Sequence, residues 1–182
     1  GITFANGLRA ILRQDPNVIM VGEIRDSETA GIAVQSSLTG HLVVSSLHTN
    51  DAPTAVPRLF DMDIEPFLVS AVLNAVIAQR LVRQIHTDCI ESYEPDAVVI
   101  ESIRLQLKQA GIPDSEIEAK IPDRLYRGAG CESDGKTGYK GRLGVYEILD
   151  ISDEVRDFIA NPNFSLSGLN KVARKQGMIT MF

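Results

Sequence analysis

The sequence predicts an α/β fold in which helices flank a sheet of parallel strands. Two short apolar runs, residues 18–21 and 41–47, alternate with helical segments along the first half of the chain. This alternation is typical of βαβ units, whose strands lie parallel in one layered sheet. The run Val18-Ile-Met-Val21 is continuously apolar, which favours a strand buried on both faces.

The first helix is expected over residues 4–13. Four apolar side chains fall on one face of that helix: Phe4, Leu8, Ile11 and Leu12. Asp15-Pro16-Asn17 then predicts a turn, because the residue before a proline avoids the helical region. Ser27 is expected to cap a second helix that ends near Leu38, where Thr39-Gly40 interrupts it.

After the second apolar run, Asn50 or Asp51 is expected to cap a third helix, which Pro57 should kink or shorten. Residues 66–75 are expected to form a further helix. For residues 75–85 the periodicity fits either a continuation of this helix or another strand, and the choice stays open.

The composition changes after Ile85, where both cysteines, a helical insert over residues 97–110 and a glycine-rich segment follow. Beyond them, residues 143–149 are strand-like, Ser152 can cap a helix, and residues 165–176 are expected to form another. We therefore expect three parts: a core over residues 1–84, a lobe over residues 85–141, and a C-terminal strand with helices over residues 142–182.

The overall composition is that of an ordinary globular domain, with 182 residues, of which 44% are hydrophobic and 23% charged. The formal net charge is −6, opposite in sign to that of most domains that grip a phosphate backbone. We therefore expect no nucleic-acid partner. Two cysteines, Cys89 and Cys131, are too few for a disulfide framework and favour a reducing compartment.

No membrane span or signal peptide is expected. The best apolar run, residues 67–79, is interrupted by polar side chains and is shorter than the ~20 residues that a span needs. The chain begins at Gly1 rather than at a methionine, with regular structure expected by Thr3, and it stops at Phe182 without a polar tail. We expect that both ends are cut.

Residues 130–137 match the phosphate-loop pattern G-x-x-x-x-G-K-[ST]. Such a loop needs a buried strand before it and a helix N-terminus directly after it. Arg124-Leu-Tyr-Arg127 is a poor buried strand, and Gly138-Tyr-Lys-Gly141 is a poor helix start because interior glycine disfavours a helix. We therefore do not expect this segment to bind phosphate.

Glu23 comes just after the first predicted strand. A carboxylate at the carboxyl edge of a sheet can orient or deprotonate the water that attacks a phosphoanhydride. The next strand has His41 at its start and His48 just past its end, where an imidazole could sense a γ-phosphate. The same residues also fit a solvated loop and ordinary surface or core histidines, and spacing alone leaves both interpretations open.

Short segments spread over nearly the whole chain form a combined pattern: Gly1-Ile-Thr-Phe-Ala5, Leu8-Arg9, Ile11-Leu-Arg-Gln-Asp-Pro16, Val21-Gly-Glu-Ile-Arg-Asp26, Thr39-Gly-His-Leu42, Leu47-His-Thr-Asn-Asp-Ala-Pro53, Ile77-Ala-Gln-Arg-Leu-Val-Arg83, Gly138-Tyr139, Gly141-Arg142 and Gly144-Val-Tyr-Glu147. Together they resemble the secretion ATPases, the motors of type II secretion and type IV pilus assembly. Each segment is modest alone, but the combination is specific.

The resemblance implies a homo-hexameric, RecA-like P-loop ATPase that uses ATP and Mg²⁺. Such a motor works at the cytoplasmic face of the inner membrane, on a platform protein of the secretion or pilus machine, and meets the membrane through its partners. By motif match, Glu23 would polarise the attacking water, and His41 and His48 would form a histidine box that senses phosphate. Arg9 and Arg13, four residues apart on one helical face, would reach toward phosphate charge, although this spacing also fits a solvated basic face.

The family P-loop lies upstream of the position that Gly1 occupies. Residues 1–84 would therefore be the second half of the RecA-like core, and we expect this chain alone to be inactive. Gly22 stands where many P-loop enzymes have a magnesium-holding aspartate, and the family shares this substitution, so Mg²⁺ would depend on the P-loop hydroxyl and on water. Pro57 and Asp63 differ from the family pattern and leave the geometry of their helix open.

Many assembly motors of the family carry two Cys-x-x-Cys pairs that hold a structural zinc ion, an insert that the retraction motors lack. The matching positions here are His86, Cys89, Cys131 and Asp134. Two thiolates, an imidazole and a carboxylate are all possible zinc ligands, so Zn²⁺ is a candidate. The alternative is a lobe held by packing, with two free thiols.

The sequence thus leaves two functions from different classes. The first is the catalytic part of a secretion or pilus-assembly ATPase. The second is a non-catalytic interaction module that docks to an inner-membrane partner. A DNA-translocating motor is disfavoured by the net charge of −6 and by an aromatic content of 5%.

Overall fold

The computed structural model describes residues 4–181, and these residues form two compact units. The first unit comprises the described residues up to Ala78 together with Glu147–Ile179, and the second comprises Gln79–Tyr146 with the described end of the chain. The start of regular structure expected by Thr3, like the first three residues of the combined sequence pattern, lies outside the described residues.

The first unit is built on a parallel βαβ arrangement, as predicted. Strand β1 (Val18–Val21) pairs in parallel with β2 (Leu42–Ser45), and helix α2 (Ser27–Leu38) connects them. The register places Val18 opposite Leu42 and Val21 opposite Ser45. The second strand is thus shorter than the predicted 41–47, because His41 and Leu47 lie outside the ladder.

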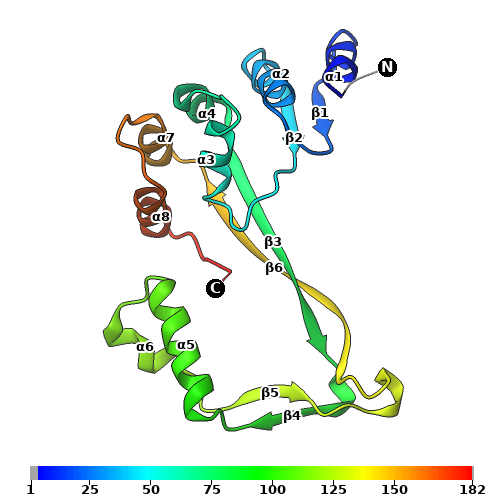
Figure 1. The fold of residues 1–182 in the computed structure, drawn as a ribbon, viewed down its shortest axis with the longest axis vertical. Coiled ribbons are helices and arrows are strands. Elements are labelled where there is room, and N and C mark those ends of the chain that lie inside the picture. The colour runs from blue at the N-terminus through cyan, green and yellow to red at the C-terminus, as the bar shows by residue number, and fades with distance from the viewer. Residues whose placement is uncertain (1–3, 182) are drawn as a thin grey trace. The chain divides into compact units, whose positions relative to one another are not determined.

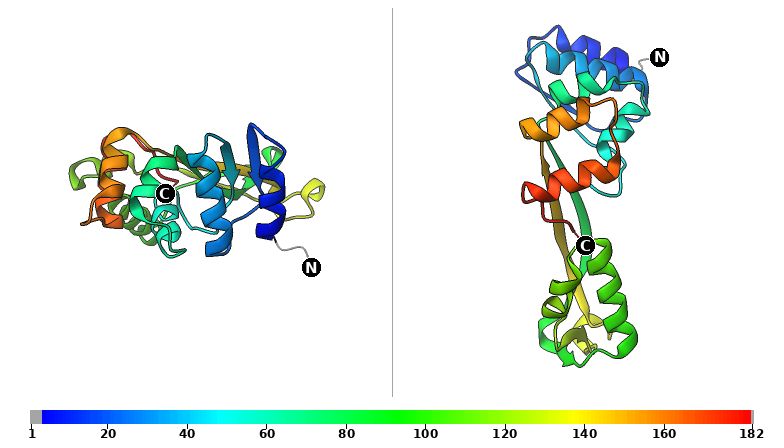
Figure 2. Two further views of the ribbon diagram at one scale, coloured as in Figure 1. Left: turned by 90° about the horizontal axis from the view of Figure 1, so that it is seen from above. Right: turned by 90° about the vertical axis from the view of Figure 1, so that its left-hand side faces the viewer.

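A row of helices accompanies this strand pair (Figure 1). Along the row, α1 (Phe4–Leu12) contacts α2, α2 contacts α4 (Pro66–Val72), α4 contacts α7 (Asp153–Ala160), and α7 contacts α8 (Leu166–Lys175). Figure 2 shows the same helices from two further sides. The largest fully buried apolar side chains of this core come from all parts of the unit: Val21, Val56, Val69, Leu149, Val155, Ile159 and Leu169.

Strand β1 alternates in burial, which differs from the prediction of a strand buried on both faces. Ile19 and Val21 are buried, whereas Val18 is 58% and Met20 79% exposed. The helices pack against one face of the pair, and among residues 4–181 nothing covers the other face to the same degree. The continuous apolar run is typical of a strand covered on both faces. Within the described residues, however, β1 is covered on one face only.

Two helix starts also differ from prediction. Asp26, not Ser27, is the N-cap of α2, because its side chain accepts a hydrogen bond from the Thr29 N–H at 2.8 Å. Helix α3 (Ala55–Phe60) begins after Thr54, later than predicted, and Asp51 instead accepts the Thr54 N–H at 2.8 Å within the preceding turn.

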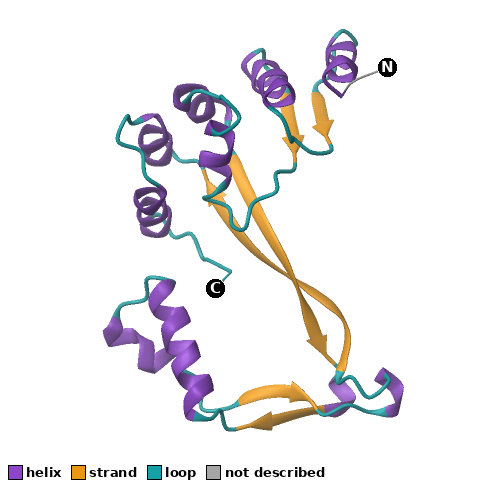
Figure 3. Cartoon of the chain, viewed as in Figure 1, coloured by secondary structure: helices purple, strands orange, loops and turns teal. Residues whose placement is uncertain are grey.

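The open choice for residues 75–85 is settled as a strand. Strand β3 (Ala75–Ile85) pairs with β6 (Tyr139–Asp150), which is longer than the predicted 143–149 (Figure 3). The second unit also has elements around the predicted helical insert: α5 (Ala97–Gln109), α6 (Asp114–Lys120), the antiparallel pair β4 (Ile90–Tyr93) and β5 (Leu125–Gly128), and the short 3₁₀ turns η1 (Thr87–Cys89) and η2 (Glu132–Asp134).

Across residues 4–181, each helix is too short or too polar to cross a lipid bilayer.

The cap of α7 gives a test of local stability. Ser152 caps this helix as predicted, with its hydroxyl accepting the Val155 N–H at 3.4 Å and donating to Gln176 Oε1 at 2.6 Å. We expect Ser152→Ala to lower the free energy of unfolding by about 1 kcal/mol, because a helix N–H loses its partner. Urea unfolding at pH 7 measures the change. Ser152→Thr keeps the hydroxyl and should retain most of the stability, so equal loss in both variants would contradict the assignment.

Candidate functional site at the carboxyl edge of the strand pair

The two parallel strands stay together beyond their last ladder residues. The Ile24 N–H donates to the Ser46 carbonyl at 3.0 Å, and the Ser46 hydroxyl donates to the Gly22 carbonyl at 2.7 Å. These bonds bring the segment after β1 beside the segment after β2. Glu23 and His48 are therefore held at the same edge of the sheet, where ligands of α/β proteins commonly bind.

One carboxylate oxygen of Glu23 contacts both the His48 imidazole and the Arg25 guanidinium. Glu23 Oε2 lies 3.0 Å from His48 Nε2 and 2.7 Å from Arg25 Nε. The hydrogen bond with His48, followed by that with Arg25, lowers the pKa of Glu23 below its usual range. The carboxylate is therefore ionised at neutral pH. The Glu23 side chain is 35% exposed, so water reaches it.

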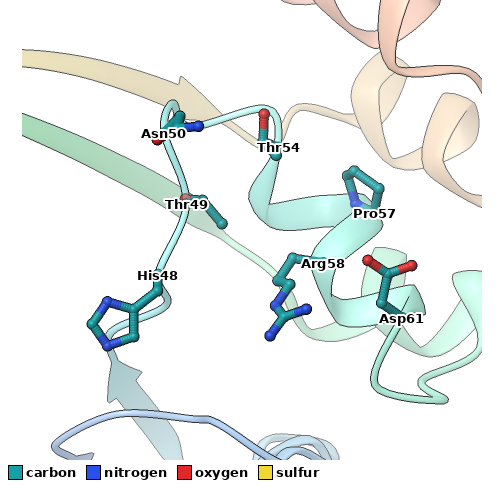
Figure 4. Close-up of a pocket in the computed structure, with 7 residues that line it drawn as sticks. All are labelled: His48, Thr49, Asn50, Thr54, Pro57, Arg58 and Asp61. Atoms are coloured by element: carbon teal, nitrogen blue, oxygen red, sulfur yellow. The ribbon is translucent and has the colours of Figure 1, made fainter.

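His48 also borders a pocket of about 370 Å³ (Figure 4). Its lining residues come from the loop after β2 and from α3 with its flanking positions, and all but the proline have polar side chains: His48, Thr49, Asn50, Thr54, Pro57, Arg58 and Asp61. Within the described residues, the Arg58 guanidinium has no hydrogen-bond or ion-pair partner, whereas the His48 imidazole is held by Glu23. The pocket thus offers an unpaired cation next to the Glu23–His48 pair.

The loop between β2 and α3 is anchored along its length. The Thr49 hydroxyl donates to the Asp51 carbonyl at 3.1 Å, and the Asp51 side chain accepts the Thr54 N–H. Further along, the Ala52 N–H donates to Glu147 Oε1 at 2.6 Å. This loop carries His48 at one end and leads into the pocket wall at the other.

His41 lies at the opposite end of β2 from His48. Its Nδ1 is 3.0 Å from the Ser36 carbonyl and 3.2 Å from the Thr39 hydroxyl, so the ring is held by the end of α2. Six residues separate the two histidines, and four of them form β2, so the strand lies between the two rings. The structure therefore brings His48, and not His41, to Glu23.

The two arginines of the N-terminal helix have different surroundings. The Arg9 guanidinium pairs with the Glu28 carboxylate of α2 at 3.0 Å and also donates to the Asn6 side chain. Arg13 follows the end of α1 and is exposed. Among the described residues, neither arginine forms a hydrogen bond or an ion pair with Glu23.

The segment that matches the phosphate-loop pattern has a different structure. It contains η2, and strand β6 follows it from Tyr139 where a phosphate loop needs a helix. Asp134 closes the segment on itself, since its carboxylate accepts the N–H groups of Cys131 and Thr137. The expectation that this segment is no phosphate loop agrees with this geometry.

The second unit gathers the four residues matched to a zinc site. His86, Cys89, Cys131 and Asp134 each offer a ligand atom, and all four atoms lie within 4.8 Å of one another. The distances from the Asp134 Oδ2 are 3.0 Å to Cys89 Sγ, 3.3 Å to Cys131 Sγ and 3.6 Å to His86 Nδ1. Ligands around one tetrahedral zinc ion are separated by roughly 3.3–3.8 Å at the usual bond lengths. The donor set fits such an ion, and two of these three distances lie within that range.

Two of the four side chains in this cluster are shielded from solvent, whereas both cysteines are half-buried. The Asp134 side chain is 0% exposed and the His86 side chain 7%. The hydrogen bond from the Cys89 thiol lowers the pKa of Asp134, and the same bond together with burial raises the pKa of Cys89 to about 11. The Cys89 thiol thus donates a hydrogen bond to the Asp134 carboxylate at this position.

Two glycines set the shape of the loops around the cluster. A Cβ atom on Gly128 would lie 1.9 Å from the Gly138 carbonyl oxygen, and Gly138 has a φ of +78°. Only glycine fits such a crossing of two backbones. Nearby, the His86 N–H donates to the same Gly138 carbonyl at 3.0 Å, and the Ala129 N–H donates to the Cys89 carbonyl at 2.9 Å. The ligand loops are therefore fixed by backbone contacts as well.

Fold and edge site together define an α/β protein with a carboxylate–histidine pair at the carboxyl ends of parallel strands. The sequence profile of the Type II/IV secretion system protein family matches residues 1–181, and the chain belongs to this family. The resemblance deduced from the sequence segments is thereby confirmed.

Individual relatives carry names from two machines. The type IV pilus assembly ATPase PilB of Thermus thermophilus is 48% identical over 181 residues, which is 100% of this chain and 19% of that protein. The type II secretion system ATPase E of Vibrio cholerae is 54% identical over 158 residues, 87% of this chain and 29% of that protein. The chain therefore spans less than a third of the length of these two relatives.

Solved structures support the α/β fold. The pilus retraction motor PilT, solved with bound ADP, matches with a TM-score of 0.60 and 26% identity over 98% of this chain and 41% of that chain. The ATPase DotB of Legionella pneumophila matches with a TM-score of 0.60 at 23% identity, covering 98% of this chain and 36% of that chain, which bears on the fold alone.

Two residues at the site were not singled out from the sequence. Arg58 sits in a short helix without a motif, and only its place on the pocket wall draws attention to it. Glu147 belongs to a segment of the family pattern, but its partner Ala52 is 95 residues away. No local spacing rule reaches over that distance.

The Glu23–His48 contact predicts a measurable change in the Glu23 carboxyl. We expect His48→Ala to raise the pKa of Glu23, because the bond that contributes most to lowering it is lost. A ¹³C NMR titration of the carboxyl carbons measures the pKa. His41→Ala is the matched control, since His41 is held by the end of α2. A Glu23 pKa that is the same in His48→Ala and in the unaltered chain would exclude the contact.

Proposed function

We propose that this chain is part of the catalytic domain of an ATP-hydrolysing motor of type II secretion or type IV pilus assembly. Family membership supports an ATPase, and relatives from both machines are about equally similar to the chain. The observation that carries the proposal is the Glu23 carboxylate, held by His48 at the edge of the strand pair.

In this proposal, Glu23 orients and polarises the water that attacks the γ-phosphate. Its Oε2 is occupied by His48 and Arg25, whereas its Oε1 forms no hydrogen bond within the described residues and can accept one from water. A lowered pKa suits orientation of water more than complete removal of its proton. His48 fixes the carboxylate and also lines the pocket, so a change at the phosphate would reach the loop that leads to α3.

ATP and Mg²⁺ are the expected substrate and metal of the intact parent. Gly22 offers no side chain for magnesium, so its ligands would come from the phosphates, from water and from polypeptide beyond this chain. We expect Arg9 and Arg13 to act toward phosphate only in an assembly, because neither contacts Glu23 within the described residues. The proposed assembly is a homo-hexamer.

We further propose that the parent works at the cytoplasmic face of the inner membrane, through a platform protein of the machine. Support comes from the names of the relatives, which are parts of secretion and pilus systems. The helical insert α5–α6 and the histidine–cysteine cluster favour an assembly motor over a retraction motor, and the greater identity to PilB than to PilT agrees.

We propose that His86, Cys89, Cys131 and Asp134 bind a structural Zn²⁺ ion, which would tie two loops of the second unit together. The chain purified without chelator should carry about one zinc per molecule, measured by inductively coupled plasma mass spectrometry after dialysis. Cys131→Ser should lose most of the metal, because it removes a thiolate ligand. Thr87→Ala, a change between two ligands, should retain it. Absence of zinc from the unaltered chain would exclude the centre and leave two free thiols.

The proposed catalytic role is tested in the full-length parent. We expect Glu23→Gln to preserve ATP binding and to slow hydrolysis by roughly 10²–10⁴-fold, because the amide orients and polarises water less well than the carboxylate. Phosphate release measures turnover, and a fluorescent ATP analogue measures binding. Glu154→Gln, which alters an exposed carboxylate paired with Lys175, is the control and should leave both unchanged. Normal turnover in Glu23→Gln would remove Glu23 from the mechanism.

A further inference from the structure

A second carboxylate in the first unit has no part in the mechanism above. Glu147 lies on β6 and is 3% exposed, which is unusual for an ionisable side chain. Burying a carboxylate is costly unless hydrogen bonds compensate for the lost water. The burial of Glu147 therefore needs a hydrogen bond that compensates for the lost water.

One hydrogen-bond partner of Glu147 is a backbone group of the loop that carries His48. Glu147 Oε1 accepts the Ala52 N–H at 2.6 Å, and Ala52 itself is fully buried. A hydrogen bond to a buried carboxylate is stronger than one between neutral groups. This contact joins two segments 95 residues apart in sequence.

Ala52 occupies the middle of the loop between the two parts of the site. The loop leaves β2 at Ser46, passes His48, and enters α3, from which Arg58 faces the pocket. Its beginning is fixed to the end of β1 by the Ser46–Gly22 bond. Glu147 fixes its middle to β6, so that His48 is held between two anchors.

We infer that Glu147 is a positioning residue for the proposed hydrolysis, which this inference takes as its basis. Its hydrogen bond with the Ala52 N–H holds the loop in the position where the His48 imidazole contacts the Glu23 carboxylate. Without the carboxylate oxygen, the buried N–H would lose its partner and the loop would shift to find another. Small displacements of a group that orients reactants lower the rate while leaving substrate binding largely intact.

The experiment uses the full-length parent protein and three variants of this position. Glu147→Leu keeps most of the volume and removes the acceptor, Glu147→Gln keeps an acceptor oxygen, and Glu147→Asp withdraws the acceptor by about 1.5 Å. The readouts are kcat and KM for ATP, the melting temperature, and hydrogen–deuterium exchange of the peptide over residues 48–56.

We expect Glu147→Leu to lower kcat by roughly 10–100-fold with KM changed less than about threefold, and to speed exchange in residues 48–56. Glu147→Gln should restore kcat to within about threefold of the unaltered protein. If Glu147→Leu does not fold, Glu147→Asp carries the test, with kcat lowered at least about fivefold.

Three results would overturn the inference. The first is an unchanged kcat in Glu147→Leu or, where that variant does not fold, in Glu147→Asp. The second is an equal loss of kcat in Glu147→Gln and Glu147→Leu, and the third is a lower melting temperature with normal kcat. Glu23→Gln is measured alongside to separate the two ideas. Absence of ATP hydrolysis in the unaltered parent would remove the proposed function itself, and normal turnover in Glu23→Gln would remove the role of Glu23. An inactive Glu23→Gln beside a fully active Glu147→Leu removes only the role of Glu147.

Discussion

The site depends on the parallel register between β1 and β2. Because Val21 lies opposite Ser45, the residues that follow each strand emerge side by side, and the Ile24–Ser46 hydrogen bond continues the pairing past the ladder. A slip by one residue would turn each side chain to the other face of the sheet. The approach of His48 to Glu23 therefore begins with strand pairing, and the Glu147–Ala52 hydrogen bond adds a second anchor to the loop that carries His48.

The electrostatics of the edge follow from that geometry. Glu23 carries its two partners on Oε2, and within the described residues its Oε1 forms no hydrogen bond. His48 is 76% exposed and borders a pocket whose wall includes an unpaired arginine. Carboxylate, imidazole and guanidinium thus follow one another over a short stretch of surface. This arrangement suits a reaction in which an anionic substrate binds, its negative charge is redistributed in the transition state, and an anionic product leaves.

Much of the fold, and the position of Glu23 in the candidate site, could be predicted from the sequence. Local patterns were sufficient for the βαβ alternation, for the cap at Ser152 and for the placing of Glu23 after a strand. They failed where tertiary contacts decide. Residues 75–85 have no periodicity that separates strand from helix, and the exposure of Met20 depends on what covers the sheet. The pairing of Glu147 with Ala52 depends on a contact between distant segments, which spacing along the chain does not encode.

The backbone crossing at Gly128 and Gly138 has a consequence for the histidine–cysteine cluster. Since the two loops meet through main-chain atoms, their course is imposed by hydrogen bonds and by the lack of side chains at the crossing. The path of the two loops at the crossing is thereby set independently of the side chains of His86, Cys89 and Cys131, whereas the Asp134 carboxylate also holds the backbone N–H groups of Cys131 and Thr137. A scaffold of this kind tolerates exchange of one donor for another, such as imidazole or carboxylate for thiolate, without rebuilding its loops. Exchange of these ligands therefore requires little change in the backbone. Replacement of Gly128 or Gly138, in contrast, would place a Cβ atom against the facing backbone.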